Sequence, residues 1–219
     1  MIPGARLVLL GRQGAGKGTQ CVRLSHHYVI PHISTGDMLR SAVREGTEFG
    51  LQAKAVMDRG ELVSDGVIGG VVAERLAADD TRERGYILDG FPRTVGQAER
   101  LSEITVGAAL DLVIDLVVPI QVVLERLAGR RVCVDCATNF SVDSPPRYGW
   151  VCDNCGGEVV QRADDTPAAI QIRLDLYERE TAPLIAWYLE RKLLTAVDGL
   201  GTAAEVTARL VAAVDARRP

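Results

Sequence analysis

The strongest chemical signal in the sequence is the glycine-rich segment 11-GRQGAGKGTQ-20. It follows a short apolar run at residues 6–10 and precedes a segment expected to be helical, which is the context of a phosphate-binding loop. The glycines let the backbone turn tightly and aim N–H groups at an anion, while the helix start adds a positive dipole. Lys17 then places a compact cation against the β- and γ-phosphates of a nucleotide.

Position 18 departs from the usual form of such a loop, which has Ser or Thr directly after the lysine. Here Gly18 follows Lys17, and Thr19 comes next. Direct ligation of Mg²⁺ by a hydroxyl at that position is therefore not expected. We expect the nucleotide phosphates and water to hold the ion instead, because Mg²⁺ keeps its waters readily.

Four of the five cysteines form the second signal, with the spacing Cys133-x₂-Cys136-x₁₅-Cys152-x₂-Cys155. This spacing is typical of a two-knuckle zinc ribbon. Four thiolates complete a tetrahedral shell, so the zinc should be structural rather than catalytic. Iron is the alternative metal, and two disulfides are the alternative to any metal. Zinc fits a redox-silent anchor better, and disulfides are disfavoured because no secretion signal is evident.

Further strings accompany the loop: 34-STGDMLR-40, 61-ELVSD-65, 89-DGFPRT-94 with Gln97, and 126-RLAGRR-131. Together they resemble the adenylate kinases, motif by motif and in the same order, over essentially the whole chain. The resemblance implies transfer of the terminal phosphoryl group of ATP–Mg²⁺ to AMP, which yields two ADP. It also implies a core with two insertions, an AMP-binding arm at residues 34–63 and a zinc-bearing ATP lid at residues 129–165.

The resemblance also implies roles for individual residues. The expected ATP contacts are Gly14, Ala15, Gly16, Lys17, Gly18, Thr19, Arg126, Arg130, Asn139, Phe140 and Gly201. The expected AMP contacts are Thr35, Arg40, Met57, Glu61, Leu62, Val63, Gly90, Phe91, Pro92, Arg93, Gln97, Arg162 and Arg173, with Gln97 reading the adenine edge. The expected catalytic residues are Lys17, Asp89, Arg93, Arg126, Arg162 and Arg173, with Asp89 orienting hydrated Mg²⁺.

Simple electrostatics agrees with this assignment. Two nucleotides bring about six negative charges together near neutral pH. Seven of the cationic residues named above are available to oppose them, and arginine suits the task because its planar fork grips two phosphate oxygens at once. The acceptor is already an anionic phosphate oxygen, so no general base is needed, and catalysis should rest on positioning and charge stabilisation.

Three other functions fit parts of this pattern. A kinase for UMP or CMP shares the mechanism, and a GTP-dependent AMP kinase shares even more. A P-loop ATPase that binds nucleic acid through its zinc ribbon belongs to a different class. Charge argues against the last, because residues 132–161 carry four acidic residues and one arginine, which would repel a phosphate backbone.

Composition bounds the partners and the compartment. The net charge is −4, so no basic field favours nucleic acid or an anionic membrane. The apolar run at residues 7–10 is too short for a signal peptide or a membrane span. We therefore expect a cytoplasmic monomer whose partners are ATP, AMP and ADP, with no nucleic acid and no membrane.

The elements that must position these residues alternate between strand and helix. Strands are expected at 6–10, 32–34, 86–89, 112–118 and 193–197, with helices between them, which predicts an α/β fold with a five-stranded parallel sheet. Residues 35–79 should form three helical pieces, with Asp65 as an N-cap, and Pro119 should lie in the first turn of a helix. A long helix is expected from Pro167 to about Leu189, and a capping box at 202-TAAE-205. The three histidines show neither metal spacing nor a paired acid, and Cys21 should be a small buried residue.

Overall fold

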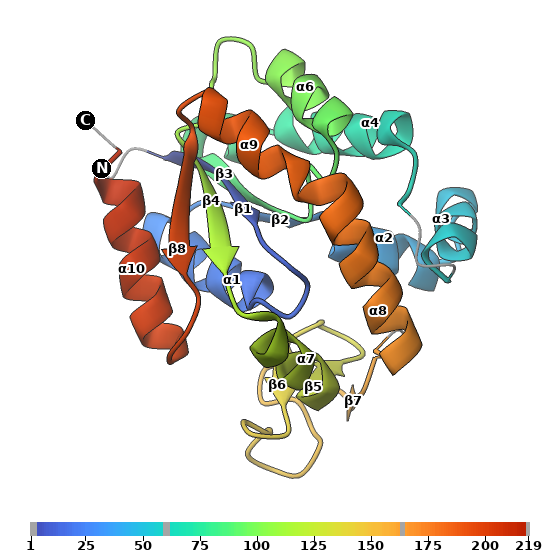
Figure 1. The fold of residues 1–219 in the computed structure, drawn as a ribbon. Helices are drawn as coiled ribbons and strands as arrows, with labels where there is room; N and C mark the ends of the chain where they lie inside the picture. Colours follow the sequence, from blue (N-terminus) through green and yellow to red (C-terminus); the bar gives the residue numbers. More distant parts are fainter. Residues whose placement is uncertain (1–3, 59–61, 163–164, 218–219) are drawn as a thin grey trace.

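The computed structural model describes residues 4–58, 62–162 and 165–217. Its centre is a parallel sheet with the order β2-β3-β1-β4-β8, as Figure 1 shows. The strands are β1 (Ala5–Leu10), β2 (His32–Ser34), β3 (Gly85–Asp89), β4 (Leu112–Val117) and β8 (Leu194–Asp198). The predicted five-stranded parallel α/β fold is confirmed.

Strand β1 alternates between two hydrophobic cores, one on each face of the sheet. Leu7 and Leu9 pack into one core, and Val8 and Leu10 pack into the other. Successive side chains of a strand point to opposite faces, so an unbroken apolar run is what a strand covered on both sides requires. This explains why the short run before the glycine loop contains no polar residue after Arg6.

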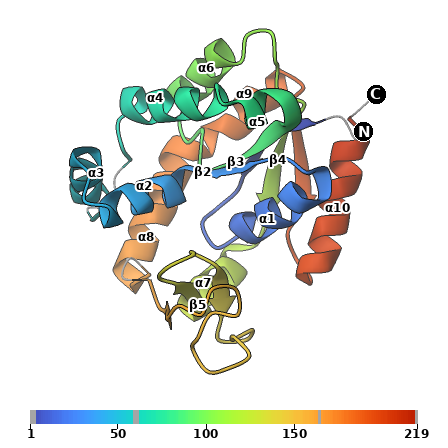
Figure 2. The ribbon, with the colours of Figure 1, turned by 180° about the vertical axis from the view of Figure 1, so that it is seen from behind.

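Helices cover both faces, and Figures 1 and 2 show the two layers from opposite sides. The first core takes its helical residues from α1 (Lys17–Tyr28), α7 (Ile120–Gly129), α8 (Pro167–Leu176) and α10 (Ala203–Asp215). The second takes them from α2 (Thr35–Arg44), α3 (Glu48–Asp58), α4 (Asp65–Leu76), α6 (Val95–Ile104) and α9 (Pro183–Glu190). The short helix α5 (Asp79–Arg84) leads into β3. Within the described residues, no helix is both long enough and apolar enough to span a lipid bilayer.

The strand order determines where a ligand can bind. β1 pairs with β3 on one side and with β4 on the other, so the chain leaves the centre of the sheet in both directions. In open parallel sheets the crevice at such a point opens beyond the carboxyl ends of the strands. The glycine-rich loop follows β1, the start of α2 follows β2, and Asp89 is the last residue of β3, so all three lie at this edge.

Side-chain caps fix several helix starts. Ser34 accepts a hydrogen bond from the Asp37 N–H, and the predicted capping box between Thr202 and Glu205 is present. Two expectations were wrong. Ser64, not Asp65, is the N-cap of α4, and Pro119 is the N-cap of α7 rather than a first-turn residue. Asp65 instead accepts hydrogen bonds from Thr94, the N-cap of α6, and from Gln97 in its first turn, so tertiary contacts outweigh its local capping preference.

The long helix expected to run to Leu189 is interrupted. A π-helical turn, η1 (Tyr177–Thr181), separates α8 from α9, and the Ala182 N–H donates to the Tyr177 carbonyl at 2.8 Å. Pro183 begins α9 and has no N–H to continue an α-helical ladder. Shifting to the wider hydrogen-bond pattern before a proline accommodates the missing donor, and such turns are frequent at functional sites.

A second, smaller sheet lies in the segment predicted to be the lid. It is antiparallel, with the order β6-β5-β7, and is made of β5 (Arg130–Cys133), β6 (Asn139–Ser141) and β7 (Val159–Val160). Its own core is very small: Cys133, Cys152 and Val159 are buried, with Phe140 packed against them. So little apolar burial implies that another interaction stabilises this sheet.

Candidate functional site

A cavity of about 410 Å³ lies at the carboxyl edge of the parallel sheet. The glycine loop, the starts of α2 and α6, the end of β3, the lid sheet and the α8–η1 segment all contribute to its wall. It brings together most of the residues singled out from the sequence: Gly14, Gly16, Lys17, Gly18, Thr19, Thr35, Arg40, Leu62, Val63, Asp89, Gly90, Pro92, Arg93, Gln97, Arg126, Arg130, Asn139, Phe140, Arg162 and Arg173.

Three expected contacts, Ala15, Phe91 and Gly201, do not line this cavity, and the side chains of two more, Met57 and Glu61, lie outside what the structure describes. Ala15 and Phe91 are buried, so they support the wall from behind. Gly201 lies on the loop before α10, outside the cavity. Met57 belongs to α3, but its side chain lies outside what the structure describes, and Glu61 lies outside the described residues altogether.

The glycine loop has the backbone shape that the sequence predicted. Gly14 and Gly16 have φ of 83° and 101°, in the left-handed region that favours glycine. A Cβ on Gly14 would also lie 2.8 Å from the Leu127 side chain, so the loop must approach α7 closely. Lys17 Nζ donates to the carbonyls of Gly11 and Arg12 at 2.7 and 3.1 Å. Burial lowers the pKa of Lys17, with Asp89 opposing the shift.

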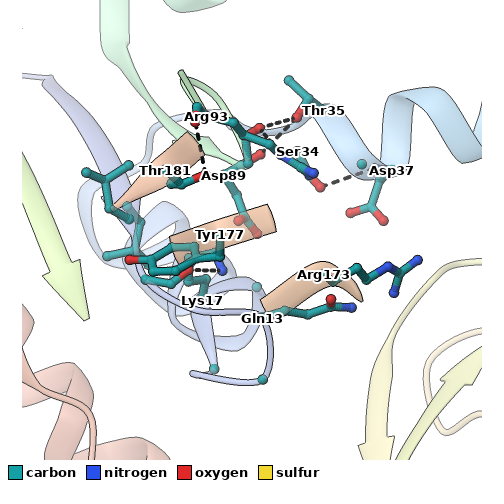
Figure 3. A pocket seen from close by; sticks show the side chains of 18 of the residues that line it. Gln13, Lys17, Ser34, Thr35, Asp37, Asp89, Arg93, Arg173, Tyr177 and Thr181 are labelled. Carbon is teal, nitrogen blue, oxygen red and sulfur yellow. Dashed lines mark hydrogen bonds between the residues drawn. The ribbon is translucent and has the colours of Figure 1, made fainter. Parts of the chain in front are cut away.

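Asp89 ends β3 opposite this lysine, and Figure 3 shows its side chain directed toward Lys17. Its carboxylate Oδ2 lies 3.8 Å from His32 Nε2. Burial alone would raise the pKa of Asp89, but His32, Lys17 and Arg93 outweigh it and hold the pKa below its ordinary value. Asp89 is therefore an anion at neutral pH, suited to a cation or a hydrated metal.

The expectation that no histidine has a paired acid was wrong for His32. In the parallel pairing of β2 with β3, Ser34 lies opposite Asp89, which brings His32 to the same end of the sheet. The two residues are far apart in the sequence, and only the strand register brings them together. His26 and His27 are exposed on α1, as expected for residues without a direct role.

Arg93 is fixed by backbone and side-chain contacts around the turn after β3. Its Nε donates to the Gly90 carbonyl at 2.8 Å, and its own carbonyl accepts a hydrogen bond from Thr181 Oγ1 at 2.9 Å. Thr35 Oγ1 donates to the same Gly90 carbonyl at 2.9 Å. These dashed contacts lie together on one side of the cavity in Figure 3. Burial lowers the pKa of Arg93, and the nearby Arg173 and Arg40 add to that shift.

Gln97 is nearly fully buried and bonded to protein groups at both ends of its amide. Its Oε1 accepts from the Arg93 N–H at 2.8 Å, and its Nε2 donates to Asp65 at 2.7 Å. Its own N–H donates to the Thr94 hydroxyl, which caps α6. Gln97 thus organises the turn that carries Arg93 and also lines the cavity, whereas its expected contact with adenine stays a prediction.

Arginines from α7, the lid and α8 form a cationic wall of the same cavity. Arg130 and Arg173 both approach Asp165, whose carboxylate is fully buried, with Arg130 Nε at 2.7 Å and Arg173 NH1 at 3.8 Å. With its amide oxygen turned toward them, Gln13 accepts from both guanidiniums at 2.7 and 2.9 Å. Arg126 donates to the carbonyls of Ala15 and Gly199 at 3.0 and 3.2 Å.

Sequence reasoning missed several residues of this wall, among them Gln13, Asp165, Tyr177 and Thr181. Gln13 occupies a position of the loop where any residue type is allowed. Asp165 shows no pattern beyond its place before a helix cap. The π-helical turn that places Tyr177 and Thr181 at the cavity has one sequence signal, the proline at 183 inside an otherwise helical pattern.

The four lid cysteines converge as a metal site requires. Their Sγ atoms all lie within 4.8 Å of one another, with Cys133–Cys155 at 3.4 Å and Cys136–Cys152 at 3.5 Å. Zinc–sulfur bonds of about 2.3 Å in a tetrahedron place sulfurs about 3.8 Å apart, so this set fits zinc. All five cysteines of the described chain are free thiols. Both knuckles turn through a left-handed residue, Ala137 in the first and Gly156 in the second.

Comparison with known proteins agrees with this site. A family model described as adenylate kinase matches residues 9–193. An adenylate kinase from Methanosarcina acetivorans is 51% identical over 195 residues, which cover 88% of this chain and 90% of the relative. An adenylate kinase from Geobacter sp. strain M21 is 48% identical over 213 residues, 96% of this chain and 99% of the relative. One from Bacillus pumilus is 50% identical over 196 residues, 88% and 90% of the two chains.

Proposed function

The chain belongs to the adenylate kinase family, and from that membership we propose how its own residues carry out the family's reaction. It is a nucleoside monophosphate kinase, a phosphotransferase that moves the terminal phosphoryl group of ATP to AMP. The observation that carries the residue assignment is the convergence of seven cations on one cavity of an acidic protein. They are Lys17, Arg40, Arg93, Arg126, Arg130, Arg162 and Arg173.

On the donor side, the glycine loop holds the ATP phosphates. The N-terminal N–H groups of α1 and the Lys17 ammonium replace the water that solvates these phosphates outside the site. Asn139 and Phe140 of the lid line the same cavity and cover the nucleotide from the other side. Arg126 bonds to the loop at Ala15 and to Gly199, so it connects the phosphate site to the segment before α10.

On the acceptor side, Arg93 and Arg40 hold the AMP phosphate near the donor. Arg40 pairs with Asp37 on α2 and is only half-buried, so the arrival of a phosphate exchanges one anionic partner for another. Thr35 and Gly90 form the adjoining wall, and Gln97 keeps the turn around Arg93 in place. A phosphate oxygen of AMP attacks the γ-phosphorus, the bond to the β-phosphate oxygen breaks, and ADP forms on both sides.

Asp89 is the residue that would hold Mg²⁺ against the ATP phosphates. It is an anion at neutral pH and lies opposite the glycine loop, and hard carboxylate oxygens suit this ion. Bound there, the ion would offset phosphate charge in the transition state. The arginine wall stabilises the same charge from the other side, and the lid excludes water that would otherwise accept the phosphoryl group.

We also propose that zinc holds the lid together and that the enzyme works as a monomer in a reducing compartment, the cytoplasm. The cysteine geometry supports zinc, and thiolate ligands must stay reduced to bind it. The seven cations converge within a single chain, so the proposed reaction needs no residue from a second copy. The acidic lid segment supports nucleotides rather than nucleic acid as partners.

A nucleotide panel tests the function. With ATP–Mg²⁺ as donor, the enzyme should phosphorylate AMP much faster than CMP, UMP or GMP, measured as the rate of nucleoside diphosphate formation. ATP alone should be hydrolysed only slowly, because an open lid leaves the catalytic cations unassembled around the γ-phosphoryl group. Faster phosphorylation of UMP than of AMP would contradict the proposal that AMP is the phosphoryl acceptor. ATP hydrolysis stimulated by DNA or RNA would favour the zinc-ribbon ATPase instead.

A further inference from the structure

Beneath the phosphate loop lies a second group of metal-binding side chains that the proposed reaction does not explain. Cys21 of α1, His32 of β2 and Asp89 of β3 each offer one donor atom, and these atoms all lie within 4.8 Å of one another. They come from three separate elements, and only the packing of α1 against the sheet brings them together. A sulfur, an imidazole nitrogen and a carboxylate oxygen are the donors that Zn²⁺ prefers.

The imidazole supplies an independent observation. Nε2 of His32 is buried and has no hydrogen-bond partner among the described residues. Its distance of 3.8 Å to Asp89 Oδ2 is too long for a hydrogen bond but is close to the separation of two ligands around one ion. A buried nitrogen without a partner carries a desolvation cost, which a bound cation would offset.

The site is also reachable. Cys21 is fully buried, but Asp89 lines the nucleotide cavity next to Lys17 and Gly18. A cation that enters the cavity therefore meets the carboxylate first and the sulfur behind it. A carboxylate and a thiolate together balance two positive charges, which offsets the repulsion from the nearby Lys17 ammonium.

We propose that Cys21, His32 and Asp89 form a second, inhibitory site for a thiophilic divalent cation such as Zn²⁺. Binding forms metal–sulfur, metal–nitrogen and metal–oxygen bonds and releases the thiol proton of Cys21 to solvent, with no change of oxidation state. The inhibition rests on the proposed role of Asp89, because an ion bound here occupies the carboxylate that should face ATP–Mg²⁺. The lid thiolates, with four sulfur ligands, fill first, so this site responds only to excess metal.

Metal stoichiometry tests the site without reference to activity. After equilibrium dialysis of the zinc-loaded enzyme against buffered micromolar free Zn²⁺ without nucleotide, elemental analysis should give two zinc ions per chain. Cys21→Ala should give one. His32→Asn should also give one, and it keeps the test decisive if the cavity left by the first variant impairs folding. His26→Asn, at an exposed histidine on α1, should still give two.

Inhibition is measured as phosphoryl transfer at saturating ATP–Mg²⁺ while free Zn²⁺ is raised. Cys21→Ala should need at least about ten times more free Zn²⁺ for half-inhibition than the wild type, as expected when a metal ligand is lost. One zinc per chain in the wild type, or two in both ligand variants, overturns the site. Zinc inhibition that is unchanged in Cys21→Ala overturns the inhibitory role. The rate of AMP phosphorylation without added zinc reports separately on the proposed function.

Discussion

Arg93 is held in place at three points, two on its backbone and one on its side chain. Its N–H donates to Gln97, its carbonyl accepts from Thr181, and its Nε donates to the Gly90 carbonyl. Arg93 lines the cavity together with Arg173 and Lys17. A side chain fixed before the substrate arrives loses little entropy when it binds a phosphate, which is the condition for electrostatic catalysis.

Arg93→Ala should therefore reduce kcat/KM for AMP by about 10²-fold or more, the usual loss for one preorganised donor. The unfolding temperature should barely change, because the two backbone hydrogen bonds of residue 93 remain. Steady-state kinetics and thermal unfolding measure the two effects. Arg100→Ala is the matched control, since that arginine is exposed on the adjoining helix α6 and pairs with Glu103. Turnover within a few-fold of the wild type would refute the role of Arg93.

Asp115 offers a prediction about stability. It is the one acidic residue in the apolar strand β4, and burial raises its pKa above the ordinary value, although Arg12 and Lys17 oppose the shift. Below the unfolded-state pKa of about 4, Asp115 is protonated in both the folded and the unfolded protein, so no charge is buried and stability is not reduced. As the pH rises through the raised folded-state pKa, the folded protein must bury a charge and loses stability.

Asp115→Asn should thus raise the unfolding temperature by a few degrees near pH 7, and the gain should shrink toward pH 4. Thermal unfolding across that range measures it. Asp143→Asn, at an exposed aspartate of the lid, should show no such trend. A gain in Asp115→Asn that is the same at both ends of the range would contradict the buried-charge explanation.

Sequence motifs located Lys17, Asp89 and Arg93 because their roles depend on local patterns: a loop before a helix, and a strand followed by a turn. Asp165 and Gln13 were missed because their roles depend on arginines that are distant in the sequence. The proximity of His32 to Asp89 was missed for the same reason, since it follows from strand pairing. Residues that act through distant neighbours carry no local pattern.

At the scale of elements, periodicity and caps predicted most helices and strands. Short apolar runs predicted where β1 and β2 end. The pair Thr202 and Glu205 predicted the capping box of α10. The apolar pattern did not predict the π-helical turn between α8 and α9, because the wider hydrogen bonding of such a turn leaves that pattern nearly intact. The turn nevertheless matters for the site, since it directs Thr181 toward the carbonyl of Arg93.

The lid sheet is the element for which the proposed zinc matters most. Its buried side chains are few, and about 30 residues with so small a core need a metal or disulfides to fold. The cations proposed to be catalytic are not among the four cysteine ligands, so zinc should set the stability of the lid rather than the reaction itself. The prediction is one tightly bound zinc per chain, found by elemental analysis of the enzyme purified without added metal.

Removal of that zinc by a chelator should lower the temperature of inactivation while leaving appreciable activity in the cold. Cys133→Ser should act in the same direction, because it removes one of the two buried thiolates. Glu158→Gln is the control, since it changes an exposed residue of the lid that carries no thiol. Metal-free protein with unchanged thermal stability would refute the structural role. Complete loss of activity with the lid still folded would indicate a catalytic metal instead.

At the scale of the whole molecule, the predicted AMP-binding arm and the predicted lid meet at a contact that the sequence did not indicate. Arg44, at the end of α2, donates through NH1 to the carbonyls of Val134 and Asp135 at 2.7 and 3.0 Å. Both acceptors lie in the first zinc knuckle, between Cys133 and Cys136. Carbonyl acceptors leave no trace in a sequence, and an exposed arginine is usually solvated, so nothing in the residue pattern predicted this pair.

This contact exists only while the arm and the lid lie together, so it should favour the arrangement that encloses both nucleotides. Exposed hydrogen bonds to a charged group contribute about 0.5–1 kcal/mol, which corresponds to roughly a two- to five-fold change in an equilibrium. Arg44→Ala should therefore raise KM for both ATP and AMP by that factor and leave the unfolding temperature unchanged. Arg82→Ala, at an exposed arginine on α5, should change neither constant. A rise in KM for one nucleotide alone would mean that Arg44 contacts that substrate directly, and the arm–lid explanation would then be wrong.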